Sequence, residues 1–212
     1  DSKPRILFLD IETSLMLAYT FGIYDQTITY KQIADDRGGK LIHCVGLKWK
    51  GKPPKVYSEW EHGYDGMLKG VHDALNEADA VVTYNGARFD LPKLQGQFAL
   101  AGMDPPPPPT QIDLYRAARK MGHVCNKLDY LAELFGLGNK VPHEGLKLWI
   151  DTFNGCPKAQ AKMARYCAGD VRLTEKVYDR LLPYIPCHPH LAETKRDFCG
   201  ACGTSPMSEY AV

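Results

Sequence analysis

An uninterrupted apolar run near the amino terminus constrains the fold more than any other part of this sequence. Residues 5–11 read R-I-L-F-L-D-I, and an apolar run of strand length without alternating polar residues is typical of a β-strand buried on both faces. A strand of that kind needs further layers of structure above and below it. The run therefore predicts the central strand of an α/β domain, and this strand ends in acidic residues.

The patterns after this run predict strands first and a mixture of helices and strands afterwards. Segments 41–49 and 55–58 flank a turn-prone stretch and together are typical of a hairpin. Five prolines at 105–109 cannot be helical and predict a short, stiff connector. Apolar spacing predicts further strands at 80–84 and 111–114, and helices over 65–78, 91–100, 114–121, 127–136 and 157–182.

Bulk composition excludes several classes of protein. The 212 residues are 44% hydrophobic and 24% charged, which is close to soluble globular domains and far from disordered or membrane chains. No leader or membrane span is recognisable, so we expect a cytoplasmic protein with reduced thiols. Four of the seven cysteines are scattered singly and are expected to be free: Cys44, Cys125, Cys156 and Cys167. The formal net charge of +1 gives no sign of a broadly basic surface for nucleic acid.

The first motif that could carry chemistry is Asp10-Ile11-Glu12 at the end of the first strand. Side chains two residues apart on a strand project from the same face, so Asp10 and Glu12 would present two neighbouring carboxylates. A divalent cation between them would remove their repulsion, and oxygen ligands favour magnesium or manganese over zinc. The alternative is an ordinary surface strand end.

The second motif is the segment 84–94, Y-N-G-A-R-F-D-L-P-K-L, which runs from a buried strand through a loop into a helix. Loops at strand ends commonly hold catalytic residues on a rigid scaffold. We expect Asp90 near the first turn of the helix, with Phe89 anchoring it inward. The alternative is that Asp90 is simply the N-cap of that helix.

The third motif is Tyr166-Cys167-Ala168-Gly169-Asp170 within the last helix. Tyr166 and Asp170 are four residues apart and therefore share one helix face, which Val177 continues toward the core. A glycine in a helix interior lowers helix stability by about 1 kcal/mol relative to alanine, so Gly169 suggests the close approach of another chain segment or a ligand. The alternative is an exposed acid beside a packed tyrosine.

In this order and spacing, D-x-E, N-G-x-x-F-D and Y-x3-D resemble the three exonuclease motifs of the DEDD (DnaQ-like) 3′–5′ exonuclease family. The resemblance extends from about residue 5 to 182, and the loop at 14–40 is similar to stand-alone phage-type members. It implies an RNase H-like mixed sheet flanked by helices over residues 1–184. Tyr166 stands where the tyrosine (DEDDy) subgroup has its tyrosine, whereas the histidine subgroup would need histidine at the place of Arg165.

The same resemblance implies a catalytic set and a mechanism. Asp10, Glu12, Asp90 and Asp170 would bind two Mg²⁺ or Mn²⁺ ions, with Asp10 bridging both, and Tyr166 would orient the attacking water. The reaction implied is hydrolysis of phosphodiester bonds from the 3′ end of single-stranded DNA, with RNA as a further substrate, releasing nucleoside 5′-monophosphates. Asp113 is expected either to support this set or, more readily, to cap the helix that follows it.

Several residues are candidates for holding the substrate. Two of them, Asn85 and Phe89, lie in the second motif. Four aromatic residues lie in the 14–40 loop, where they would either stack on terminal bases or pack the loop onto the core: Tyr19, Phe21, Tyr24 and Tyr30. A basic stretch could follow the phosphate backbone or could be a solvated helix face, and its members are Arg116, Arg119, Lys120 and Lys127.

The tail at 185–212 predicts a separate zinc-binding module. Its ligands would be Cys187, His190, Cys199 and Cys202, with His188 as a substitute. Alternatively, the C-x2-C at 199–202 would be the first half of a truncated zinc ribbon.

We expect a monomer without membrane contact, in the cytoplasm of a bacterial or phage-infected cell, with a polymerase or replication partner in trans. Two other functions stay open at the level of sequence. One is a structure-selective endonuclease on the same fold, and the other is a non-catalytic nucleic-acid-binding protein.

Overall fold

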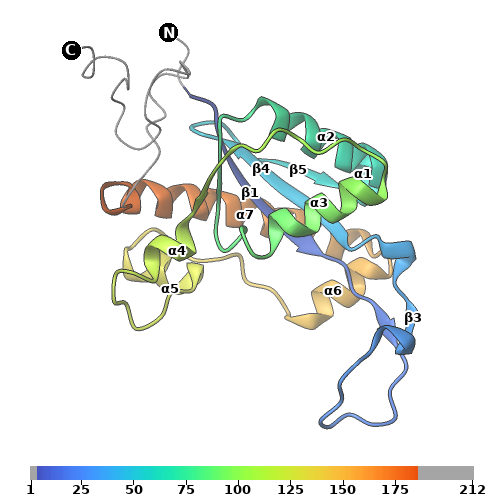
Figure 1. The fold of residues 1–212 in the computed structure, drawn as a ribbon. Coiled ribbons are helices and arrows are strands. Elements are labelled where there is room, and N and C mark those ends of the chain that lie inside the picture. The colour runs from blue at the N-terminus through green and yellow to red at the C-terminus, as the bar shows by residue number, and fades with distance from the viewer. Residues whose placement is uncertain (1–3, 186–212) are drawn as a thin grey trace, which may run out of the picture.

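Residues 4–185 are described by a computed structural model, in which five strands form one mixed sheet (Figure 1). The central strand is β1 (Ile6–Thr13), as the apolar run predicts. The order of the sheet is β5-β4-β1-β6-β7, where the other strands are β4 (Ile42–Trp49), β5 (Lys55–Ser58), β6 (Ala80–Thr83) and β7 (Thr110–Asp113).

Strand direction divides this sheet into two halves. β4 is antiparallel to β1 and to β5, which confirms the expected hairpin, whereas β6 and β7 run parallel to β1. The carboxyl ends of the three parallel strands therefore lie at the same edge of the sheet. β1 continues beyond its last pair with β6, at Phe8, so the backbone from Asp10 onward has no strand neighbour on that side.

Helices cover both faces of the sheet. Leu7, Leu9 and Ile11 of β1 pack in one core with α2 (Tyr64–Glu77) and α3 (Asp90–Leu100). On the other face, Phe8 packs in a core with α7 (Pro157–Leu181), the long helix that runs across the sheet in Figure 1. This arrangement confirms the predicted α/β fold, and the shorter helices are α1 (Glu59–His62), α4 (Leu114–Ala118), α5 (Leu128–Leu134) and α6 (Leu146–Phe153).

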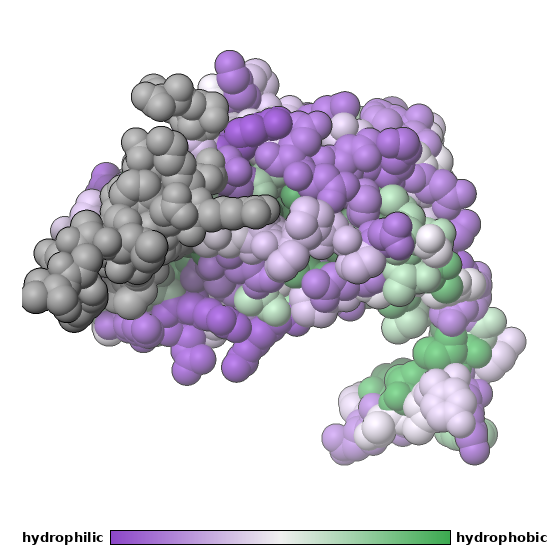
Figure 2. Space-filling view, turned by 45° about the horizontal axis from the view of Figure 1, so that its top comes forward, coloured by the Kyte–Doolittle hydropathy of each residue, from purple (hydrophilic) through white to green (hydrophobic). Residues whose placement is uncertain are grey.

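A small outlying unit follows β1 and was not anticipated from the sequence. It contains β2 (Leu17–Ala18), a 3₁₀ turn at Tyr30–Gln32 and β3 (Ile33–Asp35), with a second 3₁₀ turn at Arg37–Gly39. The segment 14–40 projects from the domain in Figure 1, and Figure 2 shows it as a lobe with green hydrophobic residues on its surface.

Helix α7 lies very close to β4. A Cβ added at Gly46 would lie 2.9 Å from the Cys167 carbonyl oxygen, so only a residue without a side chain allows this spacing. The four cysteines of the described chain are free, as expected, and Cys44 and Cys167 are fully buried at this contact. None of the described helices combines the length and the apolar character that crossing a bilayer requires.

Candidate active site

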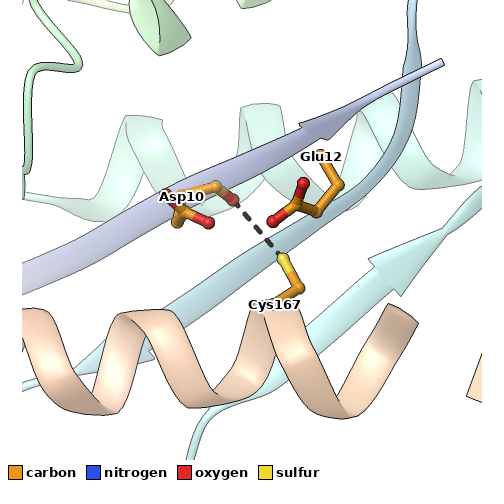
Figure 3. A group of neighbouring side chains, drawn as sticks. All are labelled: Asp10, Glu12 and Cys167. Carbon is orange, nitrogen blue, oxygen red and sulfur yellow. Dashed lines mark hydrogen bonds between the residues drawn. The ribbon is translucent and has the colours of Figure 1, made fainter. Parts of the chain in front are cut away.

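The carboxylates of Asp10 and Glu12 lie side by side between the end of β1 and helix α7 (Figure 3). An oxygen of each carboxylate and the Cys167 Sγ lie within 4.8 Å of one another. Cys167 Sγ also contacts the Asp10 carbonyl oxygen at 3.8 Å, which ties the helix to the strand beneath the carboxylates. Glu12 is buried, so the alternative of an ordinary surface strand end is wrong.

Asp90 joins this pair from the first turn of α3. Its Oδ1 accepts a hydrogen bond of 3.0 Å from the Ile11 backbone N–H, which is beyond the last residue pair of β1 and β6. The N-cap of α3 is Phe89, so the alternative in which Asp90 is the N-cap is wrong. Phe89 is 42% exposed and lies over the Lys93 ammonium, which corrects the expectation that it anchors the turn inward.

Tyr166 and Asp170 face the same site from α7, as their spacing predicts. Asp170 is 2% exposed and Tyr166 is 7% exposed, so the alternative of an exposed acid is wrong. The Tyr166 ring packs against two aromatic neighbours that also contact each other, His143 at 4.8 Å and Trp149 at 6.0 Å between ring centroids. A Cβ at Gly169 would lie 2.9 Å from Val141 Cγ2, so the segment that approaches α7 is the one around residue 141.

Lys140 is the site residue that the sequence analysis missed. Its Nζ donates to Asp170 Oδ2 at 2.6 Å and to the Tyr166 hydroxyl at 3.2 Å. The lysine lies in a loop without helical or strand periodicity, between the second and third motifs. No pattern in the sequence around it indicates a role in the site. A single lysine in a loop is too common to be recognised without the fold.

Burial and mutual repulsion disturb the ionisation of these carboxyl groups. Burial, followed by repulsion from Glu12, raises the pKa of Asp10 well above its usual range. Burial and repulsion from Asp170 raise the pKa of Glu12 to about 8. Burial raises the pKa of Asp90 to about 6 although the Ile11 N–H opposes the rise, and it raises the pKa of Asp170 although Lys140 opposes it. A cluster of this kind is stabilised by added cations.

The fold that carries these residues has counterparts among known proteins. A family model described as the RNase H superfamily matches residues 7–182, which is most of the sequence. This chain belongs to the RNase H superfamily. Among solved structures, the family B DNA polymerase from the hyperthermophilic archaeon Pyrobaculum calidifontis is similar, with a TM-score of 0.63 and 20% identity. The match covers 86% of this chain and 25% of the polymerase chain.

The similarity to the polymerase is a similarity of fold alone. At 20% identity it shows shared architecture, and this chain spans about a quarter of the polymerase's length. No curated protein matches the sequence. Membership of the RNase H superfamily supports a nuclease function, and nucleases of this superfamily generally use divalent metal ions.

The carboxylates of this RNase H-like domain fit such ions. Asp170 Oδ1 is buried and has no hydrogen-bond partner among the described residues, although a carboxylate oxygen in that position needs one. Cys167 is adjacent, but its hydrogen bond with Cys44, followed by burial, raises the pKa of its thiol, and a protonated thiol is a poor ligand for a hard cation. The carboxylate oxygen atoms in this group, those of Asp10 and Glu12, are of the kind that hard divalent cations prefer.

A cavity of about 490 Å³ opens beside this cluster and is shaped by residues from several loops. Asp10, Lys140 and Tyr166 line one part of it, and Tyr84, Asn85 and Tyr115 line another. Asn85, predicted to contact substrate, is therefore at the cavity wall. Its backbone has a positive φ of 67°, and its N–H donates to Asp113 Oδ1 at 2.8 Å.

Asp113 has the role that the sequence more readily indicates. Its Oδ1 accepts from the Tyr115 N–H at 3.0 Å as the N-cap of α4, which confirms the prediction. The same carboxylate accepts from the Asn85 and Ala87 N–H groups, so it also holds the turn that carries the second motif.

The aromatic residues of the 14–40 loop do not pack onto the core. Tyr19, Phe21, Tyr24 and Tyr30 are all exposed, so that alternative is wrong, whereas base stacking by Tyr19 and Phe21 stays a prediction. The predicted zinc ligands Cys187, His190, Cys199 and Cys202, and the substitute His188, lie outside the described residues.

Proposed function

We propose that this RNase H-like domain is a metal-dependent 3′–5′ exonuclease of the tyrosine (DEDDy) subgroup, acting on single-stranded DNA and also on RNA. The observation that carries the proposal is that β1, α3 and α7 bring the carboxylates of Asp10, Glu12, Asp90 and Asp170 close enough to repel one another. A protein that only binds nucleic acid has no need to gather four mutually repelling carboxylates, three of them buried, at one site. The products would be nucleoside 5′-monophosphates.

The carboxylates would hold two divalent ions, which when bound would activate a water molecule and stabilise the leaving oxygen of an in-line displacement. Desolvation favours the protonated form of each acid, so cation binding must displace protons from the cluster. Asp90 has an additional positioning role, because its bond to the Ile11 N–H fixes the strand that carries Asp10 and Glu12.

Tyr166 would orient the attacking water and would not act as a strong base. Burial and the Asp170 charge raise the pKa of Tyr166 to about 12, so its hydroxyl keeps its proton at neutral pH. The Lys140 ammonium donates to this hydroxyl, and the Tyr166 side chain is also hydrogen-bonded to the Asp170 carboxylate. His143 and Trp149 hold the ring, so the hydroxyl has little freedom to move away from the carboxylates.

Digestion of matched substrates tests the proposal. Single-stranded DNA and RNA of one sequence, labelled at the 5′ end, should be shortened stepwise from the 3′ end with Mg²⁺ or Mn²⁺, and nucleoside monophosphates should accumulate. An Asp10→Ala variant should give no products. A circular single strand should stay intact, and its digestion by the wild-type chain would replace the exonuclease proposal by an endonuclease on the same fold.

A further inference from the structure

A second pocket adjoins the active-site cavity and is lined by cations. Its volume is about 380 Å³, and its walls are formed by Asn85, Arg88, Tyr115, Arg116, Arg119 and Lys120. Arg88 comes from the turn after β6, and the other three cations come from α4 and the residues directly after it. All four cationic residues are exposed. Two segments that are distant in sequence therefore place four positive charges around one hollow.

These cations lack the acidic partners that other cations of the chain have. Lys69, Lys147 and Lys162 each form an ion pair of 2.6 Å with a carboxylate. Within residues 4–185, none of the four pocket cations forms an ion pair. Four unpaired cations around one pocket repel each other, and an anionic ligand removes that repulsion.

The pocket and the active-site cavity share a wall. Asn85 and Tyr115 line both of them. Asp113 accepts hydrogen bonds from the backbone N–H groups of both residues, at 2.8 Å and 3.0 Å, so one carboxylate fixes the common wall. A single extended ligand can pass over Asn85 and Tyr115 from the carboxylate cluster into the cationic pocket.

We propose that this pocket binds backbone phosphates of the substrate strand on the 5′ side of the scissile bond. The inference rests on the proposed exonuclease function, and the chemistry of that reaction sets the direction. The 3′-terminal nucleotide carries the scissile phosphate and ends in a hydroxyl, so every further phosphate of the strand lies 5′ of the cleaved bond. Arginine suits this task because its planar guanidinium group binds phosphate oxygens in pairs.

Substrate length provides the test. Dithymidylate, TpT, contains only the scissile phosphate, whereas decathymidylate also contains phosphates that can reach the pocket. The wild-type chain should cleave the decamer with a kcat/KM at least ten-fold higher than the dimer, mainly through a lower KM. An Arg116→Gln/Arg119→Gln/Lys120→Gln variant should lose that advantage on the decamer and keep the wild-type rate on the dimer.

Salt dependence and a charge-matched control separate local contact from general attraction. Releasing three phosphate contacts on a single strand should flatten the slope of log Kd against log salt by about 2. A Lys52→Gln/Lys55→Gln/Lys69→Gln variant loses the same charge near β5, at the opposite edge of the sheet from β7, and should keep the wild-type slope. A decamer with one neutral methylphosphonate linkage at a position that reaches the pocket should bind the wild-type chain more weakly than the unmodified decamer does, whereas the triple variant should bind both decamers equally.

Binding is measured by fluorescence anisotropy with Ca²⁺ and labelled decathymidylate, so the outcome does not depend on turnover. If the triple variant of the pocket binds the decamer as tightly as wild type and with the same salt slope, the pocket is only a solvated surface and the inference is wrong. If the wild-type chain cleaves neither substrate with Mg²⁺ or Mn²⁺, the exonuclease proposal fails separately, while the binding comparison still decides whether the pocket takes phosphates.

Discussion

At the scale of single residues, Tyr166 and Lys140 are linked to the carboxylates by hydrogen bonds, and the proposed function makes neither of them a metal ligand. The Lys140 ammonium joins the Asp170 carboxylate to the Tyr166 hydroxyl. The Tyr166 hydroxyl, which would orient water, should affect the rate of catalysis, whereas the Lys140 ammonium, which offsets repulsion between carboxylates, should affect stability. The two roles can therefore be tested separately.

Replacing Tyr166 by phenylalanine should lower kcat by roughly 10- to 100-fold, because the ring stays packed while the hydroxyl that positions water is lost. Metal affinity, measured by isothermal titration calorimetry with Mn²⁺, should change less than two-fold. A variant that is fully active, or one that binds no metal, would show that the role assigned to Tyr166 is wrong.

Replacing Lys140 by glutamine should destabilise the metal-free domain by about 1–3 kcal/mol near pH 8, since it removes the partner of a buried carboxylate. The cost should be smaller at pH 5, because the raised pKa of Asp170 favours its protonated form as pH falls, and a protonated carboxyl group needs no counter-charge. Urea unfolding at the two pH values measures the difference. Lys147→Gln, which breaks an exposed pair with Asp151, is the matched control and should leave stability nearly unchanged.

At the scale of elements, the site depends on how closely the loop around residue 141 approaches α7. Gly169→Ala favours the helix by about 1 kcal/mol but places a Cβ 2.9 Å from Val141 Cγ2. We expect thermal stability to change little, while nuclease activity falls because the displaced loop carries Lys140 away from Tyr166. Gly169→Ala/Val141→Ala should restore most of the activity. Equal activity of the single and double variants would contradict this contact.

At the scale of the whole molecule, proton and metal binding at the cluster should control stability together. The pKa values of Glu12 and Asp90 are raised in the folded state, to about 8 and about 6, so their contribution favours folding at low pH. It is present below the unfolded-state pKa of about 4 and is lost as pH rises through about 6 and then about 8. The metal-free domain should therefore become less stable across this range.

Mn²⁺ should reverse this loss. At a free concentration of about 100 times Kd, it should raise Tm by roughly 5–10 °C at pH 8.5, and by less at pH 6, where protons compete for the same carboxylates. Thermal unfolding with and without Mn²⁺ at the two pH values measures the effect. Asp10→Ala should abolish the pH-dependent part of the shift, whereas an equal shift in that variant would place the metal elsewhere.

Features that depend on local spacing were predictable from the sequence, because they need only the period of a strand or a helix. The shared face of Asp10 and Glu12 follows from alternation along β1, and the shared face of Tyr166 and Asp170 follows from four-residue spacing in α7. The central position of β1 follows from its unbroken apolar run. The positions of β6, β7 and α3 along the chain were predictable for the same reason.

Contacts between distant segments were decided only by the tertiary structure. Lys140 contacts Asp170 from a loop without periodicity. Arg88 lines the same pocket as Arg116 and Arg119 because β6 and β7 end at the same edge of the sheet. Phe89 faces outward because Asp90, one residue later, turns inward to the Ile11 N–H. The sequence alone determined which side chains each element could present, whereas the packing of helices on the sheet decided which of them meet, since a contact depends on both partners.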